Sequence, residues 1–462
     1  MLTKSPTFQV DPTEPFKEDY LNRKKIAEYL TGLIDTCDEP FVLAIDAGWG
    51  RGKTTFINQW RAALNIDEYP CLYFNAWKND FVDDPLVSLI GEFEAAINLR
   101  NSDPTSKLAE YLRATKSIGG AIVRSSIPMA LKVLASSVIG GGVLGAEALG
   151  SVLERVATEQ IEQYDTQKRT LESFRENVES VADELSGSSE KPLVFFVDEL
   201  DRCRPTYAVE LLERLKHLFS VKGIVFVLAL DKGQLAHSVK ALYGNGFDAI
   251  GYLRRFIDLE FDLPDPEPGL YTNFLYGIFG LEAFFTEHTA DGAAYARNQF
   301  LEAFSMLAAV FGLGLRDQEQ CFTRISLIFR TINPREQIHP ILLATLLVLR
   351  MADTDLYDGY LSGRIGTEEL KKRISTDAIG RAFMEGNYGA ALEAFLEVGL
   401  ADREEMERLR QFWESRAKAA DVSERDQRRI PVYLEVLGKL ERSRPTVATW
   451  LAEKIEFTDN FQ

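Results

Sequence analysis

The sequence predicts an α/β fold with a central parallel sheet, followed by a largely helical region. Short apolar stretches without polar alternation occur at residues 41–45, 193–197 and 223–230, a pattern typical of strands buried on both faces. Helical stretches separate them, as in a sheet built from right-handed crossovers. From Gly269 onward the pattern is helical almost throughout. Four prolines are expected to punctuate that region: Pro334, Pro340, Pro431 and Pro445.

The other elements of the predicted core follow from the same patterns. Strands are predicted over residues 71–77 and 256–263, and Pro264 and Pro266 stop the second one. Helices are predicted where apolar residues recur at helical spacing, over residues 19–30, 54–64, 85–97, 153–185 and 207–219.

The amino-acid composition is that of a globular protein, and its negative net charge argues against a general nucleic-acid-binding surface. The 462 residues are 46% hydrophobic and 26% charged, with a formal net charge of −18. A nucleic-acid surface is not indicated, because phosphate binding needs clustered lysines and arginines. The four cysteines are widely spaced without a metal or redox pair, and residues 1–15 contain no apolar signal segment. We therefore expect a cytoplasmic protein.

A glycine-rich turn between the first predicted strand and the next helix has the features of a phosphate-binding loop. It reads Gly48-Trp-Gly-Arg-Gly-Lys-Thr54, with Ala47 where the usual pattern has its first glycine. Because strand, three glycines, Lys-Thr and helix follow in order, a chance turn is the weaker interpretation. Glycines let N–H groups approach phosphates, Lys53 is expected to reach the β- and γ-phosphates, and the Thr54 hydroxyl to ligate Mg²⁺. The predicted nucleotide contacts are Gly48, Trp49, Gly50, Arg51, Gly52, Lys53, Thr54 and Thr55.

Two acidic residues end the predicted strand at 193–197. Asp198 and Glu199 lie at the carboxyl edge, where ligands bind in open α/β sheets. Mg²⁺ prefers oxygen ligands, so Asp198 is the expected partner of Thr54. Glu199 is expected to orient or deprotonate the water that attacks the γ-phosphate.

Two further acids have ordinary structural alternatives. Asp201 is a third carboxylate nearby, but Arg202 and Arg204 are close enough in sequence to pair with it, so a cap or turn role is favoured. Asp231 ends the next predicted strand. It either senses the γ-phosphate through a water or caps the following helix, and the sequence does not decide between the two.

Three arginines are candidates for neutralising charge that develops on the γ-phosphate. Arg254 and Arg255 precede the last predicted strand, and Arg316 begins a helix. For each, an ordinary salt bridge is the competing explanation, and for the first two the partners would be Asp258 or Glu260. We prefer the functional role for all three.

Residues 116–153 are rich in Gly, Ala, Val, Ile and Ser and low in charge. Their longest charge-free run, residues 133–146, has 14 residues, whereas a spanning helix needs about 20. Charged residues interrupt the wider stretch, and three glycines at 140–142 break it. A buried helical hairpin or a partner surface is therefore favoured, and membrane contact is the alternative.

Together these motifs resemble the KAP family of P-loop NTPases over roughly residues 15–335. The segments that carry the resemblance are Gly48-Trp-Gly-Arg-Gly-Lys-Thr54, Phe74-Asn-Ala-Trp77, Asp198-Glu-Leu-Asp-Arg-Cys203, Val227-Leu-Ala-Leu-Asp231, Tyr252-Leu-Arg-Arg255 and Leu315-Arg-Asp317. The tryptophan within the loop and the Glu-Leu-Asp-Arg-Cys string are the most specific of these features.

The resemblance implies an ATPase of the additional-strand class, related to AAA+ and STAND proteins, with strand order 5-1-4-3-2 and with ATP and Mg²⁺ as ligands. Relatives in the AAA+ group supply an arginine to a neighbour's nucleotide, which implies a homo-oligomer with Arg255 in that role. Many relatives carry transmembrane segments where residues 116–153 lie here. Bacterial members often act in anti-phage or mobile-element functions beside effector proteins. Departures from the family pattern are Ala47 for Gly, Glu199 for the common Asp, and Arg254 for the usual acid.

The expected organisation has five parts: residues 1–100 and 191–264 as the two parts of the NTPase core, 101–190 as a helical insertion, 265–350 as a helical lid and 351–462 as a helical C-terminal domain. The leading hypothesis is a Mg²⁺-dependent ATPase that switches the helical region and, through it, a partner. The alternatives are an ATP-binding scaffold without turnover and a membrane-anchored NTPase, and Glu199 favours hydrolysis. Adenine is expected by default, because nothing resembles the Asn-Lys-x-Asp string that reads guanine.

Overall fold

The computed structural model describes residues 10–17, 19–37, 39–82, 84–100, 110–111, 113–114, 169, 172–187, 191–216, 220–288, 292–333, 336–419, 422–442 and 446–461. The chain forms two compact units, with residues 23–264 in one and residues 265–462 in the other. The predicted insertion at 116–153 lies outside the described residues. Among the residues that are described, no helix combines the length and apolar character needed to cross a bilayer.

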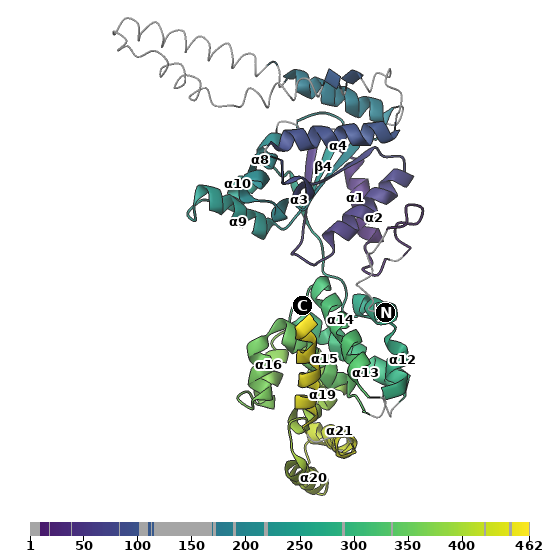
Figure 1. Ribbon diagram of the computed structural model, residues 1–462, viewed down its shortest axis with the longest axis vertical. Coiled ribbons are helices and arrows are strands. Elements are labelled where there is room, and N and C mark those ends of the chain that lie inside the picture. Colours follow the sequence, from purple (N-terminus) through teal and green to yellow (C-terminus); the bar gives the residue numbers. More distant parts are fainter. Residues whose placement is uncertain are drawn as a thin grey trace, which may run out of the picture. The chain divides into compact units, whose positions relative to one another are not determined.

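The first unit contains a five-stranded parallel sheet (Figure 1). Its strands are β1 (Phe41–Asp46), β2 (Cys71–Asn75), β3 (Leu193–Asp198), β4 (Ile224–Leu230) and β5 (Leu259–Asp262). They lie in the order β2-β3-β4-β1-β5. The predicted parallel α/β fold and its strand order are therefore confirmed.

Helices cover both faces of this sheet. They are α1 (Lys24–Ile34), α2 (Lys53–Ile66), α3 (Ala76–Asn79), α4 (Pro85–Arg100), η1 (Leu200–Arg202), α8 (Pro205–Lys216), α9 (Lys232–Tyr243) and α10 (Ala249–Leu253), and residues 172–186 are also helical. Successive strand residues point to opposite faces, so Phe196 packs with α1 and α2, whereas Phe195 packs with α4, α8 and α9. β3 and β4 are buried along their whole length, and β1 is buried from Val42 to Ile45. Burial on both faces accounts for the apolar residues of these three strands, which do not alternate with polar ones.

Two strand boundaries differ from the prediction. β2 ends at Asn75 rather than Trp77, because the Asn75 side chain accepts a hydrogen bond from Lys78 N and caps α3. β5 spans only Leu259–Asp262, since Phe256 belongs to the turn that follows α10.

The second unit is helical in its described part. Its elements are α11 (Leu270–Ile278), α12 (Leu281–His288), α13 (Ala293–Val310), α14 (Leu315–Thr331), α15 (Pro340–Ala352), α16 (Thr354–Leu361), α17 (Thr367–Ile374), α18 (Ala378–Glu385), α19 (Asn387–Val398), α20 (Arg403–Ala417), α21 (Glu424–Glu441), α22 (Val447–Phe457) and η2 (Thr458–Phe461). One hydrophobic core extends from Leu275 to Ile455 and includes α15, which is buried from Pro340 to Leu349. This core crosses residue 350, and the division into a lid and a C-terminal domain stays a prediction.

The prediction that Pro431 interrupts the helical pattern is wrong. Pro431 lies inside α21, where it removes one backbone hydrogen bond. The helix continues because Ile430, Tyr433 and Leu437 bury the same face in the core. Pro340, by contrast, begins α15 as expected.

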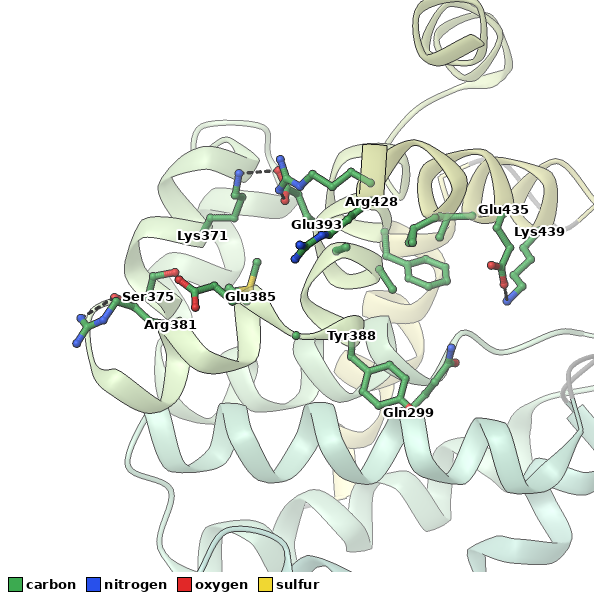
Figure 2. A pocket seen from close by; sticks show the side chains of 18 of the residues that line it. Gln299, Lys371, Ser375, Arg381, Glu385, Tyr388, Glu393, Arg428, Glu435 and Lys439 are labelled. Carbon is green, nitrogen blue, oxygen red and sulfur yellow. Dashed lines mark hydrogen bonds and ion pairs between the residues drawn. The ribbon is translucent and has the colours of Figure 1, made fainter. Parts of the chain in front are cut away.

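A pocket of about 1100 Å³ opens within the helical unit, lined by residues of α13, α17, α18, α19 and α21 (Figure 2). Part of its lining is a buried ion cluster. Lys371 Nζ donates to Glu393 Oε1 at 2.5 Å, Arg429 pairs with the other oxygen, and Glu393 is only 4% exposed. A fully buried carboxylate is tolerated here because two cations neutralise it.

Candidate nucleotide-binding site

The loop between β1 and α2 has the backbone that its glycines permit. Gly50 and Gly52 have φ values of 73° and 78°, in the left-handed region that glycine occupies without steric cost. A Cβ added at Gly48 would meet only Arg51 Cγ, at 3.9 Å, so packing within the chain does not require that glycine. The space beside Gly48 fits the close approach of a phosphate. Ala47 is not among the described residues with positive φ, which explains how it replaces the usual first glycine.

Lys53, at the start of α2, lies back over this loop. Its Nζ donates to Ala47 O and, at 3.3 Å, to Gly48 O. Burial lowers the Lys53 pKa, and the carboxylates around it, first Asp201 and then Asp231, oppose that shift. The ammonium group is therefore held at the loop by weak carbonyl acceptors that phosphate oxygens can replace.

Arg23 donates hydrogen bonds to two backbone carbonyls of this loop, a contact that the sequence does not predict. Its Nη2 donates to Arg51 O at 2.8 Å and its Nη1 to Gly52 O at 3.1 Å. Arg23 is 1% exposed and lies just before α1, while Asp19 accepts a hydrogen bond from its backbone N. A buried guanidinium thus fixes the carbonyls immediately before α2.

Asp198 ends β3 and is 1% exposed. Its Oδ2 accepts from Tyr73 OH at 3.0 Å, its Oδ1 accepts from Glu199 N at 2.8 Å, and the Thr54 hydroxyl also bonds to the carboxylate. Burial raises the Asp198 pKa, and the hydrogen bonds from Thr54 and Tyr73 partly offset that rise. The structure thus brings together the two residues that the sequence proposed for Mg²⁺.

Glu199 follows in an unusual backbone conformation. Its φ of 60° and ψ of 27° are left-handed, which costs a non-glycine residue about 1 kcal/mol or more. Its Oε2 accepts from Asn75 Nδ2 at 2.7 Å, and its Oε1 pairs with Arg202 Nη1 at 2.8 Å. Asn75 ends β2 directly beside Asp198 in the register, so the neighbouring strand positions Glu199.

The expected pairing of Asp201 with Arg202 or Arg204 is wrong. Arg202 pairs with Glu199 and Arg204 pairs with Asp80. Asp201 is 6% exposed, and its Oδ2 accepts from the indole N–H of Trp49 in the phosphate-binding loop. The η1 turn places this carboxylate against the loop. Its Oδ1 is buried without a hydrogen-bond partner in the described part of the chain, which is costly and fits a site that takes a further donor or cation.

The remaining candidates separate into two groups. Asp231 Oδ1 accepts from Gln234 N at 3.0 Å and caps α9, so the capping role is present and phosphate sensing stays a prediction. The pairing of Arg254 or Arg255 with nearby acids is wrong, because Asp258 accepts from Val42 N and Glu260 pairs with Lys232.

Both of these arginines are exposed, and neither side chain has a hydrogen bond or ion pair with the described residues. Arg316 is exposed at the start of α14, in the helical unit, and its role toward the γ-phosphate stays a prediction.

Nucleotide and Mg²⁺ fit the donor set that these residues form. Mg²⁺ is usually held by one or two carboxylates together with waters and phosphate oxygens. Thr54 and Asp198 match that demand, and the described residues contain no cluster of three or more His, Cys, Asp or Glu side chains that would hold a metal alone. The residues therefore suit an ion that arrives with a phosphate ligand.

Comparison with known proteins agrees with this geometry. A model described as the KAP family P-loop domain matches residues 23–276, more than half of the chain. The chain belongs to the KAP family of P-loop NTPases. The matched region contains the loop, β3 and its acids, and the helix that precedes Arg255, so this P-loop domain is of the nucleotide-binding type.

One similar protein matches about a third of the chain. An uncharacterized protein of Methanocaldococcus jannaschii is 27% identical over 179 residues, which is 35% of this chain and 89% of that protein. Its printed description assigns no activity, so the functional argument rests on the family and on the site.

Proposed function

We propose that this KAP protein is a Mg²⁺-dependent ATPase whose nucleotide cycle switches its helical unit and, through it, a partner protein. One observation carries the proposal. Thr54 bonds to Asp198, and Glu199 follows Asp198 beside the loop that holds Lys53. A phosphate cradle, a buried carboxylate and a second carboxylate at the same strand end are the parts that hydrolysis requires.

Each residue has a separate task in the proposed reaction. Lys53 and the N–H groups of the loop bind the phosphates, and Thr54 and Asp198 hold Mg²⁺, which when bound neutralises phosphate charge. Glu199 orients the attacking water and accepts its proton. Attack forms a bond from the water oxygen to the γ-phosphorus and breaks the bond to the β–γ bridging oxygen, which leaves ADP and inorganic phosphate.

Glu199→Gln separates this function from the rival, a scaffold that binds ATP without turnover. The amide keeps the size of the side chain but cannot take a proton, so phosphate release at saturating ATP should fall about 100-fold or more while ATP affinity stays. Glu260→Gln is the matched control, because that carboxylate pairs with Lys232 and should leave the rate unchanged. Equal, negligible rates in wild type and Glu199→Gln would leave only the scaffold.

The proposed active form is an oligomer in which Arg255 completes a neighbour's site. Its support is an exposed guanidinium without a partner among the described residues, just after α10. An arginine supplied in trans can be worth several orders of magnitude in rate. Specific activity should then rise with protein concentration. Arg255→Ala mixed with Lys53→Ala should regain activity, whereas a concentration-independent rate without rescue would assign Arg255 to its own chain or to no catalytic role.

Base preference and biological role are further parts of the proposal. Adenine is the proposed base, and competition of ATP against GTP for the site tests it directly. A role in anti-phage defence beside an effector protein follows from the family resemblance alone. Its test is phage plating efficiency with the wild-type protein and with Lys53→Ala, which should lose protection if the nucleotide cycle drives it.

A further inference from the structure

One buried guanidinium contacts two successive peptide groups of the phosphate-binding loop. Arg23 Nη2 donates to Arg51 O at 2.8 Å, and its Nη1 donates to Gly52 O at 3.1 Å. The N–H groups of the same two peptides are those of Gly52 and Lys53. Because a trans peptide group is planar, its N–H points away from its C=O. A side chain that fixes both carbonyls therefore also fixes the direction of both N–H groups, toward the opposite side of the backbone.

The backbone at these residues has the conformation of an anion-binding concavity. Gly52 is left-handed, with φ 78° and ψ 25°, and Lys53 begins the right-handed helix α2. A left-handed residue beside a right-handed one turns successive N–H groups into one concave surface. The first N–H groups of a helix also have no partner within the helix. The N–H groups of Gly52 and Lys53 thus belong to the surface that suits phosphate, and Arg23 holds the carbonyls behind them.

Arg23 is itself held in place from two directions. Asp19 accepts hydrogen bonds from the backbone N of Arg23 and of Lys24, each at 2.8 Å. Trp60 Nε1 donates to Thr31 Oγ1 at 2.9 Å, which joins α2 to α1. Arg23 is 1% exposed, so it acts on a ligand of the loop through the backbone and not by direct contact.

We propose that Arg23 is a positioning residue for phosphate binding, which aims the N–H groups of Gly52 and Lys53 at the phosphates before the ligand arrives. A guanidinium suits this task because its donors form a rigid fork that reaches two carbonyls at once, whereas lysine offers a single ammonium group. A concavity that is already formed avoids the cost of ordering on binding. The inference rests on the proposed function in that the loop binds phosphates, and it does not depend on hydrolysis.

Arg23→Lys tests the proposal, because it keeps the charge and loses the fork. The affinity for Mg²⁺-ATP and for Mg²⁺-tripolyphosphate should fall by about five- to tenfold, measured by isothermal titration. Tripolyphosphate has no base, so an equal loss for both ligands assigns the effect to phosphate binding. Arg381→Lys is the matched control. Arg381 Nη1 also donates to two successive carbonyls, Ser375 O and Thr376 O, but in the helical unit, and this variant should bind both ligands like the wild type.

Two further measurements separate positioning from general support of the fold. Gly52→Ala disturbs the same peptide groups, because a side chain disfavours the left-handed conformation. Arg23→Lys should therefore weaken binding less in a Gly52→Ala background than in the wild type. Free guanidinium, at a concentration well below that which unfolds the protein, should restore part of the ATP affinity of Arg23→Ala, whereas sodium chloride at the same ionic strength should not. If Arg23→Lys does not fold, Arg23→Gln replaces it with the same expected loss.

The outcomes distinguish this inference from the proposed function. An equal loss for both ligands in Arg23→Lys, reduced in the Gly52→Ala background, supports the inference. Wild-type affinity in folded Arg23→Lys, a loss confined to ATP, or an equal loss in Arg381→Lys overturns it. If Lys53→Ala loses affinity while Arg23→Lys does not, only the role of Arg23 falls. If folded Lys53→Ala keeps wild-type affinity, the assignment of the loop to phosphates falls as well.

Discussion

Each unit of the molecule buries a carboxylate almost completely, but the two carboxylates have very different neighbours. Glu393 in the helical unit is 4% exposed and is held between Lys371 and Arg429. Asp198 in the NTPase unit is 1% exposed and contacts hydroxyl groups and one backbone N–H, with no ion pair to a described cation. The first carboxylate is neutralised by the chain itself. The second has a raised pKa because burial removes it from water, and the hydrogen bonds from Thr54 and Tyr73 only partly offset that rise.

The difference in neighbours indicates a structural role for Glu393 and a ligand-binding role for Asp198. Burying a charge is costly unless a partner neutralises it. For Glu393 the two cations offset that cost, and the ion pairs connect α17, α19 and α21. Asp198 lies at the carboxyl edge of a parallel sheet, where ligands bind. Under the proposed function, a Mg²⁺ ion bound together with the nucleotide would neutralise this carboxylate.

Neutralising the buried acid of the helical unit should have the largest effect on stability. Glu393→Gln removes the buried charge partner of Arg429 and leaves Lys371 with the exposed Glu368 alone, so the free energy of unfolding of that unit should fall by about 3–5 kcal/mol. Glu368→Gln is the matched control. Glu368 also pairs with Lys371 but its side chain is 86% exposed, so its loss should cost less than about 1 kcal/mol. Urea unfolding followed by circular dichroism measures both, and equal effects would remove the distinction.

Removing the loop cation should affect ligand binding and leave the fold intact. Lys53→Ala deletes charge-assisted bonds to phosphate, worth about 1.5–3 kcal/mol, so nucleotide affinity should weaken at least about tenfold. Lys191→Ala is the control, because Lys191 donates to Asp67 O away from the loop. Isothermal titration with ATP measures the affinities. Wild-type affinity in folded Lys53→Ala would end the assignment of this loop to the phosphates.

The contact between Trp49 and Asp201 should have the smallest effect. Trp49→Phe keeps an aromatic ring but removes the indole N–H that donates to Asp201 Oδ2, whereas Oδ1 already lacks a hydrogen-bond partner among the described residues. We expect a loss of about 1 kcal/mol in stability of the NTPase unit, and a smaller loss when Asp201→Asn is combined with it, because the buried charge is gone. Thermal unfolding of the single and double variants gives the comparison. Additive losses would mean that the two residues act separately.

Sequence predicted the sheet and its acidic edge because those features are local. Unbroken apolar stretches mark strands buried on both faces, and Asp198 follows one of them directly. The loop was recognised from glycines whose left-handed φ values the structure contains at Gly50 and Gly52. Asn75 lies in one of the segments that resemble the KAP family. It ends a strand that pairs with β3, and that position could have predicted a contact with the acidic residues after β3.

Contacts between residues that are far apart in the sequence are not predicted by local patterns. Arg23 reaches Gly52 across 29 positions, and Trp49 reaches Asp201 across 152. Asp201 was expected to pair with neighbouring arginines, but the η1 turn places it against the loop. Pro431 stays inside α21 because burial of one helix face outweighs the loss of one backbone hydrogen bond. Each case depends on packing that no local pattern encodes.

Thermal unfolding of Asp198→Asn, with and without MgATP, tests the central claim most directly. The amide oxygen can still accept from Tyr73, but the uncompensated buried charge is gone. The apo protein should therefore unfold at the same temperature as the wild type or higher, and the Mg²⁺-dependent part of the stabilisation by ATP should be lost. An apo unfolding temperature below that of the wild type, with the full Mg²⁺-dependent stabilisation retained, would show that Asp198 is a structural acid like Glu393 and contradict the account.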